Sequence, residues 1–438
     1  MFRLEVILSS CLMCFLLLSS VTAQKTAIQS DPYESLKYAD QLFNNGIYAA
    51  AQSQYEKTIE MITPANSTTF ATYRKNAELG YAKCAVRQNL PNGERLIEDF
   101  IRTYSPDPIA KDALIELADF YFNKKEYEKA LKYYNSSSSI NFGKEKQAEI
   151  DFKMGYSYLV KKNLNQAART FSRSIDVESD YQYDIMYYYA ICQFKLGDYR
   201  KANTNFKKVE KSVKYKSHVP FNIAQIYFAE GDYRKVIEYG EPKLNQKTIR
   251  NRKNICQLVG CAYFELENYE KALPLLEIYE RESQKLPQED FYRLGYVYYE
   301  TGNYEAAADK FGELNNEKSK LGQYAQFYSG ISYLKLKNKR KAHIAFGKAK
   351  DLNFDEEIAR EANFNFGKLS YELGRNREAL SVLQNIEKGS PYFNESQNIM
   401  SDIFLKDKNY GNSIAIMDNM SGLSPQLKEP YQKISYLY

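Results

Sequence analysis

The sequence has few of the residues on which most enzymes depend. Of its 438 residues none is tryptophan, and only two, His218 and His343, are histidine. Neither histidine accompanies a nucleophile motif, so general-base chemistry centred on histidine has little to work with. No phosphate-binding glycine loop and no group with metal-ligand spacing occurs in the sequence. We therefore expect no catalysis, no metal and no cofactor, and we expect His343 to lie on a solvated helix surface.

The sequence also has no large excess of positive or negative charge. The chain has 60 basic and 55 acidic residues, which gives a net charge of +5. Such a balance implies no strongly charged partner, and we expect no nucleic-acid binding. One basic run, from Lys207 to Lys216, is predicted to be a solvated edge of the fold. The alternative for this run is contact with anionic lipid or polysaccharide.

Cysteine is too scarce for a disulfide framework. Two of the six cysteines, Cys11 and Cys14, lie in the amino-terminal segment discussed next. The other four, at positions 84, 192, 256 and 261, have no zinc-site spacing. Three of them, at positions 84, 192 and 261, fall where buried small residues are expected, so we predict buried free thiols there.

Long apolar runs are absent after residue 23. Before it, Met1 to Ala23 contains Arg3, an apolar stretch from Cys11 to Leu18 and a small-residue ending at Ala23. This order is typical of a secretory signal peptide, which we expect to be cleaved after Ala23. The predicted domains are a signal peptide at 1–23, a short linker at 24–31 and a single array at 32–438. We expect an exported protein, in the periplasm or associated with the outer membrane.

What the sequence does contain is an internal repeat. A small residue is followed nine positions later by a turn residue, usually tyrosine, and twelve positions later by a second small residue, usually alanine. The pattern occurs eleven times, mostly with a period of 34 to 37 residues. Such a period predicts an array of helix pairs. The first small residues are Ala39, Gly80, Ala118, Gly155, Ala190, Ala224, Gly260, Gly295, Gly330, Gly367 and Ser401, and the second are Ala51, Asn92, Ala130, Ala167, Ala202, Val236, Ala272, Ala307, Ala342, Ala379 and Ser413.

The small residues predict close contact between two antiparallel helices, because helices approach closely only where a facing side chain is small. Between the two columns lie turn sequences such as Gly197-Asp198-Tyr199, in which glycine ends one helix and aspartate caps the next. Four residues after the second column comes a large apolar residue, such as Phe171 or Phe311, which predicts the core face of the second helix. Gly240 interrupts this column, and we predict that Tyr239 substitutes for it.

The pattern resembles the tetratricopeptide repeat, with glycine or alanine at the eighth position, tyrosine at the seventeenth, alanine at the twentieth and phenylalanine at the twenty-fourth. Phe291 to Phe311 fits closely, whereas the copy around Gly80 and Asn92 is degenerate. The resemblance implies an all-α fold, a right-handed α-solenoid of about eleven helix hairpins plus a terminal unpaired helix. The copies are predicted to start near residues 32, 73, 111, 148, 183, 217, 253, 288, 323, 360 and 394, with a partial copy near 428.

The resemblance also implies where a partner binds. In the family the inner face of the first helix lines a concave groove, and its fifth and ninth positions carry contacts. By position these are Tyr81, Tyr156 and Tyr296 at the ninth, and Tyr187 and Tyr292 at the fifth. Further fifth-position rings are Phe221, Phe327 and Phe364. The family's carboxylate clamp, a lysine and an asparagine at these two positions of one copy, is absent from the sequence.

Two functions are open at this point. The favoured one is a non-catalytic adaptor of the bacterial cell envelope that binds a peptide or helix of a protein partner in its groove, with peripheral membrane association only through a partner. The richness in Tyr, Lys and Asn is similar to that of exported repeat proteins of the Bacteroidetes. The alternative is a sensory or regulatory arm of a longer protein, whose output or membrane domain would lie beyond residue 438.

Overall fold

The computed structural model describes residues 28–137, 142–246, 248–418 and 425–435, and these contain helices and no strand. The predicted cleavage after Ala23 lies outside the described residues. The helices are α2 (Pro32–Asn44), α3 (Tyr48–Met61), α4 (Ala71–Arg87), α5 (Gly93–Tyr104), α6 (Pro108–Asn123), α7 (Tyr127–Ser136), α8 (Lys144–Val160), α9 (Leu164–Arg173), α10 (Gln182–Lys195), α11 (Tyr199–Val209), α12 (Val219–Ala229), α13 (Tyr233–Leu244), α14 (Arg252–Glu265), α15 (Tyr269–Glu282), α16 (Gln288–Glu300), α17 (Tyr304–Gly312), α18 (Lys320–Lys335), α19 (Lys339–Asp351), α20 (Glu356–Glu372), α21 (Asn376–Leu383), α22 (Phe393–Lys406), α23 (Tyr410–Asp418) and α24 (Pro425–Ser435).

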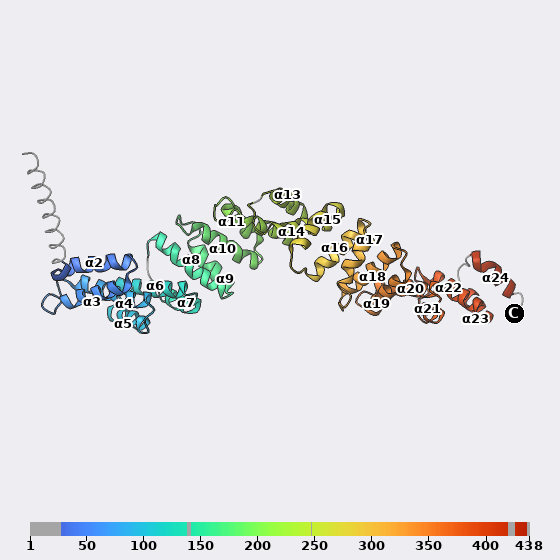
Figure 1. The fold of residues 1–438 in the computed structure, drawn as a ribbon, viewed down its shortest axis with the longest axis horizontal. Helices are drawn as coiled ribbons and strands as arrows, with labels where there is room; N and C mark the ends of the chain where they lie inside the picture. Colours follow the sequence, from blue (N-terminus) through green and yellow to red (C-terminus); the bar gives the residue numbers. More distant parts are fainter. Residues whose placement is uncertain (1–27, 138–141, 247, 419–424, 436–438) are drawn as a thin grey trace, which may run out of the picture. The chain divides into compact units, whose positions relative to one another are not determined.

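The helices pair into hairpins that stack within two compact units. Unit 1 ends at Tyr215 and holds five described hairpins, from α2/α3 to α10/α11. Unit 2 begins at Lys216 and holds six hairpins, from α12/α13 to α22/α23, followed by α24. In each unit the first helix of a hairpin also packs against the next hairpin. Within a unit the hairpins follow one another in sequence order, as the colours in Figure 1 show. The predicted all-α solenoid of hairpins is therefore confirmed.

A glycine and a large apolar side chain lock five of the eleven described hairpins together. A Cβ placed on Gly155 would lie 2.6 Å from Cε1 of Phe171, and one on Gly330 would lie 2.8 Å from Cε1 of Phe346. The ring of the second helix thus occupies the space that any side chain on the first helix would need. The same relation, sixteen residues apart, joins Gly260 to Leu276, Gly295 to Phe311 and Gly367 to Leu383. The eight second-column alanines, all 0% exposed, are Ala51, Ala130, Ala167, Ala202, Ala272, Ala307, Ala342 and Ala379.

The second hairpin departs from the predicted columns. Asn92 is exposed at the N-cap position of α5, where its side chain makes no capping hydrogen bond. The small residue packed on α4 is Gly93, whose Cβ would lie 3.0 Å from the backbone of Ala85. The core residue is correspondingly Ile97, which is fully buried, and not Leu96. The physical reason is a longer first helix, because α4 continues to Arg87 before the turn.

The turns inside the hairpins repeat one backbone conformation. The seventh residue after the first small residue has a positive φ in ten of the described hairpins, with glycine at five of them, such as Gly197 and Gly302, and other residues elsewhere, such as Lys337. The next residue caps the second helix; Asp198, for example, accepts a hydrogen bond from the Lys201 amide at 3.1 Å. The turn tyrosine then packs on a ring five residues earlier, so the predicted turn chemistry is confirmed. These ring pairs are Phe43–Tyr48, Phe122–Tyr127, Phe194–Tyr199, Phe228–Tyr233, Phe264–Tyr269 and Tyr299–Tyr304.

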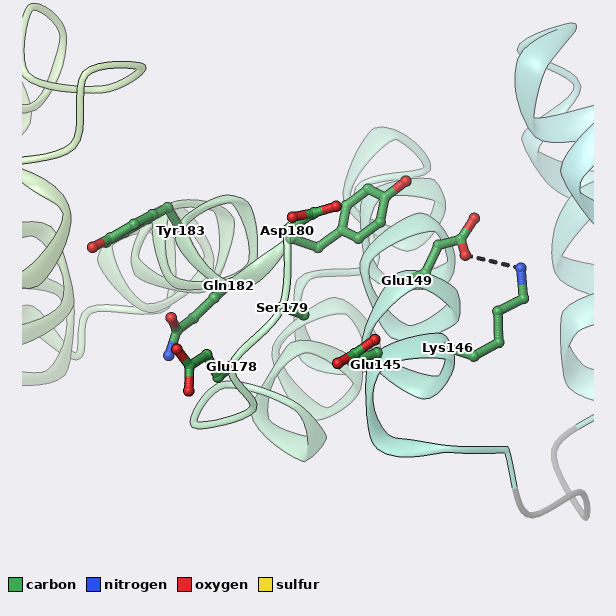
Figure 2. Close-up of a pocket in the computed structure, with 9 residues that line it drawn as sticks. Glu145, Lys146, Glu149, Glu178, Ser179, Asp180, Gln182 and Tyr183 are labelled. Atoms are coloured by element: carbon green, nitrogen blue, oxygen red, sulfur yellow. Dashed lines mark hydrogen bonds and ion pairs between the residues drawn. The ribbon is translucent and has the colours of Figure 1, made fainter.

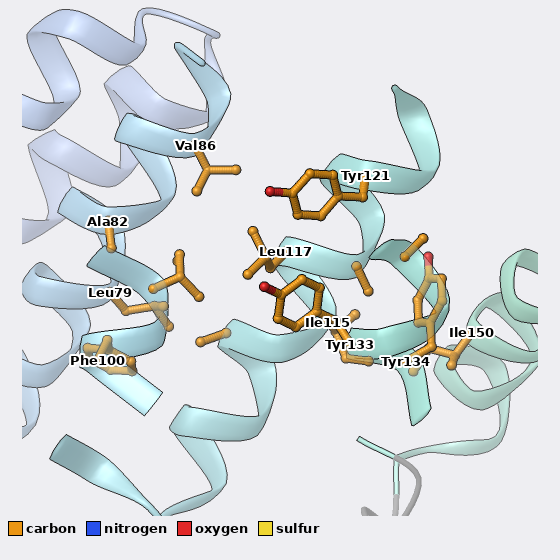
Figure 3. Close-up of a cluster of buried hydrophobic side chains, with 14 of the residues drawn as sticks. Leu79, Ala82, Val86, Phe100, Ile115, Leu117, Tyr121, Tyr133, Tyr134 and Ile150 are labelled. Carbon is orange, nitrogen blue, oxygen red and sulfur yellow. The ribbon is translucent and has the colours of Figure 1, made fainter. Parts of the chain in front are cut away.

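Within each unit the core spans neighbouring hairpins. Figure 3 shows one part of it in unit 1, where side chains from α4, α5, α6, α7 and α8 interdigitate. Within it the rings of Tyr121 and Tyr133 stack at 5.8 Å, and both hydroxyls donate to Glu94. Aromatic residues therefore fill this core while their hydroxyl groups stay satisfied at its edge.

Two further sequence predictions concern buried positions. The prediction for Tyr239 is wrong, because this tyrosine stays partly exposed and Val259 of the next hairpin packs where a side chain on Gly240 would lie, 2.7 Å from its Cβ position. The predicted free thiols are confirmed at Cys84, Cys192 and Cys261, which are buried, and the fourth cysteine of the described residues, at position 256, is a buried free thiol too.

Candidate functional site

Three of the five predicted contact tyrosines lie in two aromatic clusters, one in each unit. The unit 1 aromatic cluster consists of Phe122, Tyr127, Phe152, Tyr156 and Tyr188, from α6, α7, α8 and α10. At its centre the ring of Tyr156 lies 5.1 Å from that of Tyr188 in an edge-to-face arrangement. The rings of Phe122 and Tyr127 each lie 6.0 Å from Tyr156 on its other side. The cluster thus bridges three consecutive hairpins.

The unit 2 aromatic cluster has the same plan. It consists of Phe264, Tyr269, Tyr292, Tyr296 and Tyr328, from α14, α15, α16 and α18. The central rings, Tyr296 and Tyr328, meet edge to face at 5.0 Å. Phe264 and Tyr269 lie 5.8 and 5.7 Å from Tyr296. Each ring contact of the unit 1 aromatic cluster therefore has a counterpart here.

The repeat explains why the cluster is built twice. The five rings stand at the same repeat positions in both clusters. Two rings lie four and nine residues after the first small residue of one copy, which is Ala118 or Gly260. Two lie three residues before and one residue after that of the next copy, Gly155 or Gly295, and the fifth lies two residues before that of the third copy. The first helix of a hairpin supplies most of the rings, and the turn tyrosine supplies one. A stack of similar hairpins places such residues side by side.

All ten rings are partly exposed. Burial raises the pKa of Tyr296 well above its usual range, and Tyr328 and Glu300 add to this shift. Burial likewise raises the pKa of Tyr188 to about 12. The hydroxyls are therefore neutral donors at physiological pH, beside accessible ring surface. Such a surface binds apolar side chains and offers hydrogen bonds at its edge.

The other predicted contact residues lie elsewhere. Tyr81 is partly exposed and packs against the buried cluster around Leu36 in the first two hairpins. The ring of Tyr187 is half-buried and stacks on Tyr215 at 4.2 Å. Of the fifth-position phenylalanines, Phe221 is partly exposed, whereas those at positions 327 and 364 are buried.

Sequence reasoning missed the residues that complete the clusters. Tyr188 and Tyr328 stand two residues before a first-column small residue, a position at which no contact was expected. The turn tyrosines Tyr127 and Tyr269 were interpreted only as turn residues, yet each also packs against the central tyrosine. For Tyr188 the sequence did contain an indication, the run Tyr187-Tyr188-Tyr189, because neighbouring rings must point to different sides of one helix.

A separate pocket of about 800 Å³ lies in unit 1, at the start of α8 and α10 (Figure 2). Its lining carries the carboxylates of Glu145, Glu178 and Asp180, and an ion pair between Lys146 and Glu149 at 2.8 Å. The described residues contain no group of His, Cys, Asp or Glu side chains that could hold a metal ion. The pocket is open and acidic, and we assign no chemistry to it.

His343 is not on a solvated surface, which corrects the sequence prediction. Its side chain is buried, its ring stacks on Phe366 at 4.2 Å, and its Nε2 lies 2.9 Å from Ser370 Oγ and 3.0 Å from Glu378 Oε2. The reason is the next hairpin, which covers this face of α19 with α20 and α21. Serine and carboxylate meet the same ring nitrogen, whereas a catalytic triad places them on opposite nitrogens. This group therefore joins two hairpins.

The other histidine is also held in a neutral form. Nε2 of His218 lies 3.1 Å from a guanidinium nitrogen of Arg250, which can only donate, and Nδ1 lies 3.1 Å from Ser217 Oγ. Burial lowers the pKa of His218, and Arg250 lowers it further. This histidine is at the start of α12 and makes none of the ring contacts of the unit 2 aromatic cluster.

Family models described as "Tetratricopeptide repeat" match residues 85–137, 184–212 and 260–314. No curated protein matches the chain. Structures similar to it include YrrB, described as a tetratricopeptide repeat protein with an unusual peptide-binding site (17% identity, 47% of this chain and 97% of that one, TM-score 0.35). A tetratricopeptide repeat protein from Parabacteroides merdae is 18% identical over 58% of this chain and 98% of that one, with a TM-score of 0.33.

The repeat signatures, the hairpin stack and the family models lead to one assignment. Tetratricopeptide repeats are in general non-catalytic. They commonly bind other proteins. The chain is a tetratricopeptide repeat protein, a helical scaffold for protein–protein interaction.

Proposed function

We propose that this chain is an adaptor of the bacterial cell envelope and that its aromatic clusters hold a peptide or a helix of a partner protein. The observation that carries the proposal is the duplication of the same five partly exposed rings around Tyr156 and Tyr296. Rigid rings supply contact area with little loss of conformational entropy, which is why tyrosine is enriched at binding hot spots. Contacts at successive hairpins suit an extended or helical ligand.

The envelope part of the proposal is supported by the sequence of Met1 to Ala23 alone. Among the described helices none is long and apolar enough to span a membrane. We propose export to the periplasm, with any membrane association made through the partner. Fractionation of the native host and mass spectrometry of the mature amino terminus test this. We expect a chain that begins at Gln24, and an intact leader on a chain in the cytoplasm would refute export.

The binding part of the proposal is tested by affinity capture from envelope extract with the purified chain as bait. We expect Tyr156→Ala, Tyr296→Ala or their combination to lower recovery of the partner. Matched controls are Tyr158→Ala and Tyr333→Ala, which remove partly exposed tyrosines three residues after the small residues of their helices and outside the clusters. Circular dichroism melts check that all five variants are folded.

The comparison between these variants decides the proposal. Recovery that falls with the cluster variants and not with the controls supports it, and dependence on one cluster assigns the site to that unit. Recovery that is unchanged in the double cluster variant, or that falls equally with the controls, refutes binding at the clusters.

A further inference from the structure

The two aromatic clusters have the same rings but different charged rims. Beside the unit 2 aromatic cluster stand Glu267, which precedes the turn asparagine, and Glu300, at the end of α16; both side chains are exposed. At the equivalent places beside the unit 1 aromatic cluster stand Lys125 and Val160. The two clusters therefore have equivalent rings, but only the unit 2 aromatic cluster has carboxylates at these two places.

The carboxylates of the rim influence the tyrosine hydroxyls. Burial is the main cause of the raised pKa of Tyr296 and of Tyr269; Glu300 adds to the shift at both tyrosines, and Glu267 adds to it at Tyr269. Glu300 and Glu361 likewise contribute to the raised pKa of Tyr328.

These carboxylates are also not neutralised by a salt bridge. Within the described residues Glu267, Glu300 and Glu361 form no ion pair with a lysine or arginine, whereas many other carboxylates of unit 2 do. On the next helix, α18, Lys320 is held by Asp355 at 3.0 Å. The rim thus combines uncompensated negative charge with the negative faces of aromatic rings, and both attract a cation.

We infer that the unit 2 aromatic cluster binds a lysine- or arginine-containing segment of a partner protein, whose apolar stems lie on the rings while its charges meet Glu267, Glu300 and Glu361. The inference rests on the proposed function, since it specifies the ligand of one of the two clusters. A basic side chain satisfies both parts of the surface, because its methylene stem is apolar and its end is charged. An acidic segment is repelled by the rim, and a neutral one leaves the carboxylates uncompensated.

A synthetic peptide of alternating lysine and serine, labelled with fluorescein, is the probe, and fluorescence anisotropy measures its binding to the full chain. Peptides with glutamate or glutamine in place of lysine are the comparison. The overall charge of +5 repels the lysine peptide, so general attraction does not produce binding. We expect binding of the lysine peptide alone, weakened by salt because screening reduces the attraction of an exposed rim.

Variants locate the site. Since exposed ion pairs contribute little each, we expect Glu267→Gln with Glu300→Gln to weaken binding by about two- to thirtyfold. Tyr296→Ala has a similar effect. The matched changes in unit 1, Lys125→Gln with Val160→Gln and Tyr156→Ala, leave the affinity unchanged. Both glutamates are exposed, and glutamine has nearly the same shape as glutamate. We therefore expect these variants to stay folded, so that a loss of binding reports the loss of charge.

A gain-of-function variant tests whether the rim and rings are sufficient. Lys125→Glu with Val160→Glu gives the unit 1 aromatic cluster two of the carboxylates of unit 2, and we expect it to bind a second equivalent of the lysine peptide. An unchanged stoichiometry would show that these groups do not make the site, and so would overturn the inference.

Several outcomes of the binding experiment would also overturn it. These are equal affinity for the three peptides, loss of binding with Glu178→Gln in the unit 1 pocket in place of Glu300→Gln, and an equal effect of Tyr156→Ala and Tyr296→Ala. The proposed function can survive this failure: a captured partner that depends on Tyr296 but not on Glu300 supports cluster binding and refutes the basic ligand.

Discussion

The ring of Phe311 lies against the backbone of Gly295, sixteen residues before it in the same hairpin, so that a Cβ on this glycine would lie 2.8 Å from Cε1 of the ring. Because Phe311 is fully buried, the ring has no space into which to move. We predict that Gly295→Ala destabilises unit 2 by about 1–3 kcal/mol, the usual effect of overpacking a core. Urea unfolding followed by circular dichroism measures it.

Gly389→Ala is the control for this prediction. No atom lies within 4 Å of a Cβ built on Gly389, which is in the loop after α21. The control is expected to leave stability nearly unchanged. An equal effect of the two substitutions would contradict the lock between the glycine and the ring.

The turn conformation gives a prediction of the opposite sign. Lys337 has φ of 58°, at the place where other turns have glycine. A side chain in this conformation is strained by roughly 1 kcal/mol, so Lys337→Gly is expected to stabilise unit 2 by up to about that amount. Lys335→Gly, at the last residue of α18, is expected to destabilise it, since glycine disfavours a helix. Thermal melts of both variants check the contrast, and equal signs would refute it.

The buried histidine predicts a pH dependence. Burial lowers the pKa of His343, with a further contribution from Arg375 and an opposing one from Glu378. The unfolded chain, with a histidine pKa of about 6.5, takes up a proton more readily than the folded one, so stability falls as the pH drops below that value. His218 contributes in the same direction. We expect His343→Gln to flatten the pH dependence of the melting temperature, and unchanged slopes would refute this role.

The thiols are predicted to be unreactive in the folded chain. Burial raises the pKa of Cys84, Cys192 and Cys261 to about 12, so little thiolate is present at neutral pH. Iodoacetamide treatment followed by peptide mass spectrometry is expected to show alkylation of these three only after denaturant is added. Rapid alkylation in native buffer at any of the three would contradict the burial.

The sequence was sufficient for the fold because the repeat is dictated by local geometry. A small residue, a left-handed turn and a large apolar residue at fixed spacing define each hairpin, and the stack follows from repeating it. The second hairpin escaped the prediction because a longer α4 shifts Gly93 and Ile97 by one position. A fixed spacing cannot show such a shift.

The candidate site was predicted only in part. Tyr156 and Tyr296 were found from their position in the repeat, yet Tyr188 and Tyr328 come from the following hairpin. His343 was misplaced for the same reason, since Ser370 and Glu378 approach it from the next hairpin. Contacts between hairpins depend on how neighbours stack, and a pattern within one copy does not contain that information.

The locks between glycine and ring bear on how such a gene can change in length. Five of them join two residues of a single hairpin, so recombination that duplicates or deletes a whole hairpin keeps both members of each lock together. Gly80 and Gly347 differ, because they receive the rings of Tyr55 and Phe366 from a neighbouring hairpin. A deletion that begins or ends between the two members of such a pair leaves the ring without its cavity, so we expect the two hairpins that share the pair to be kept or lost together.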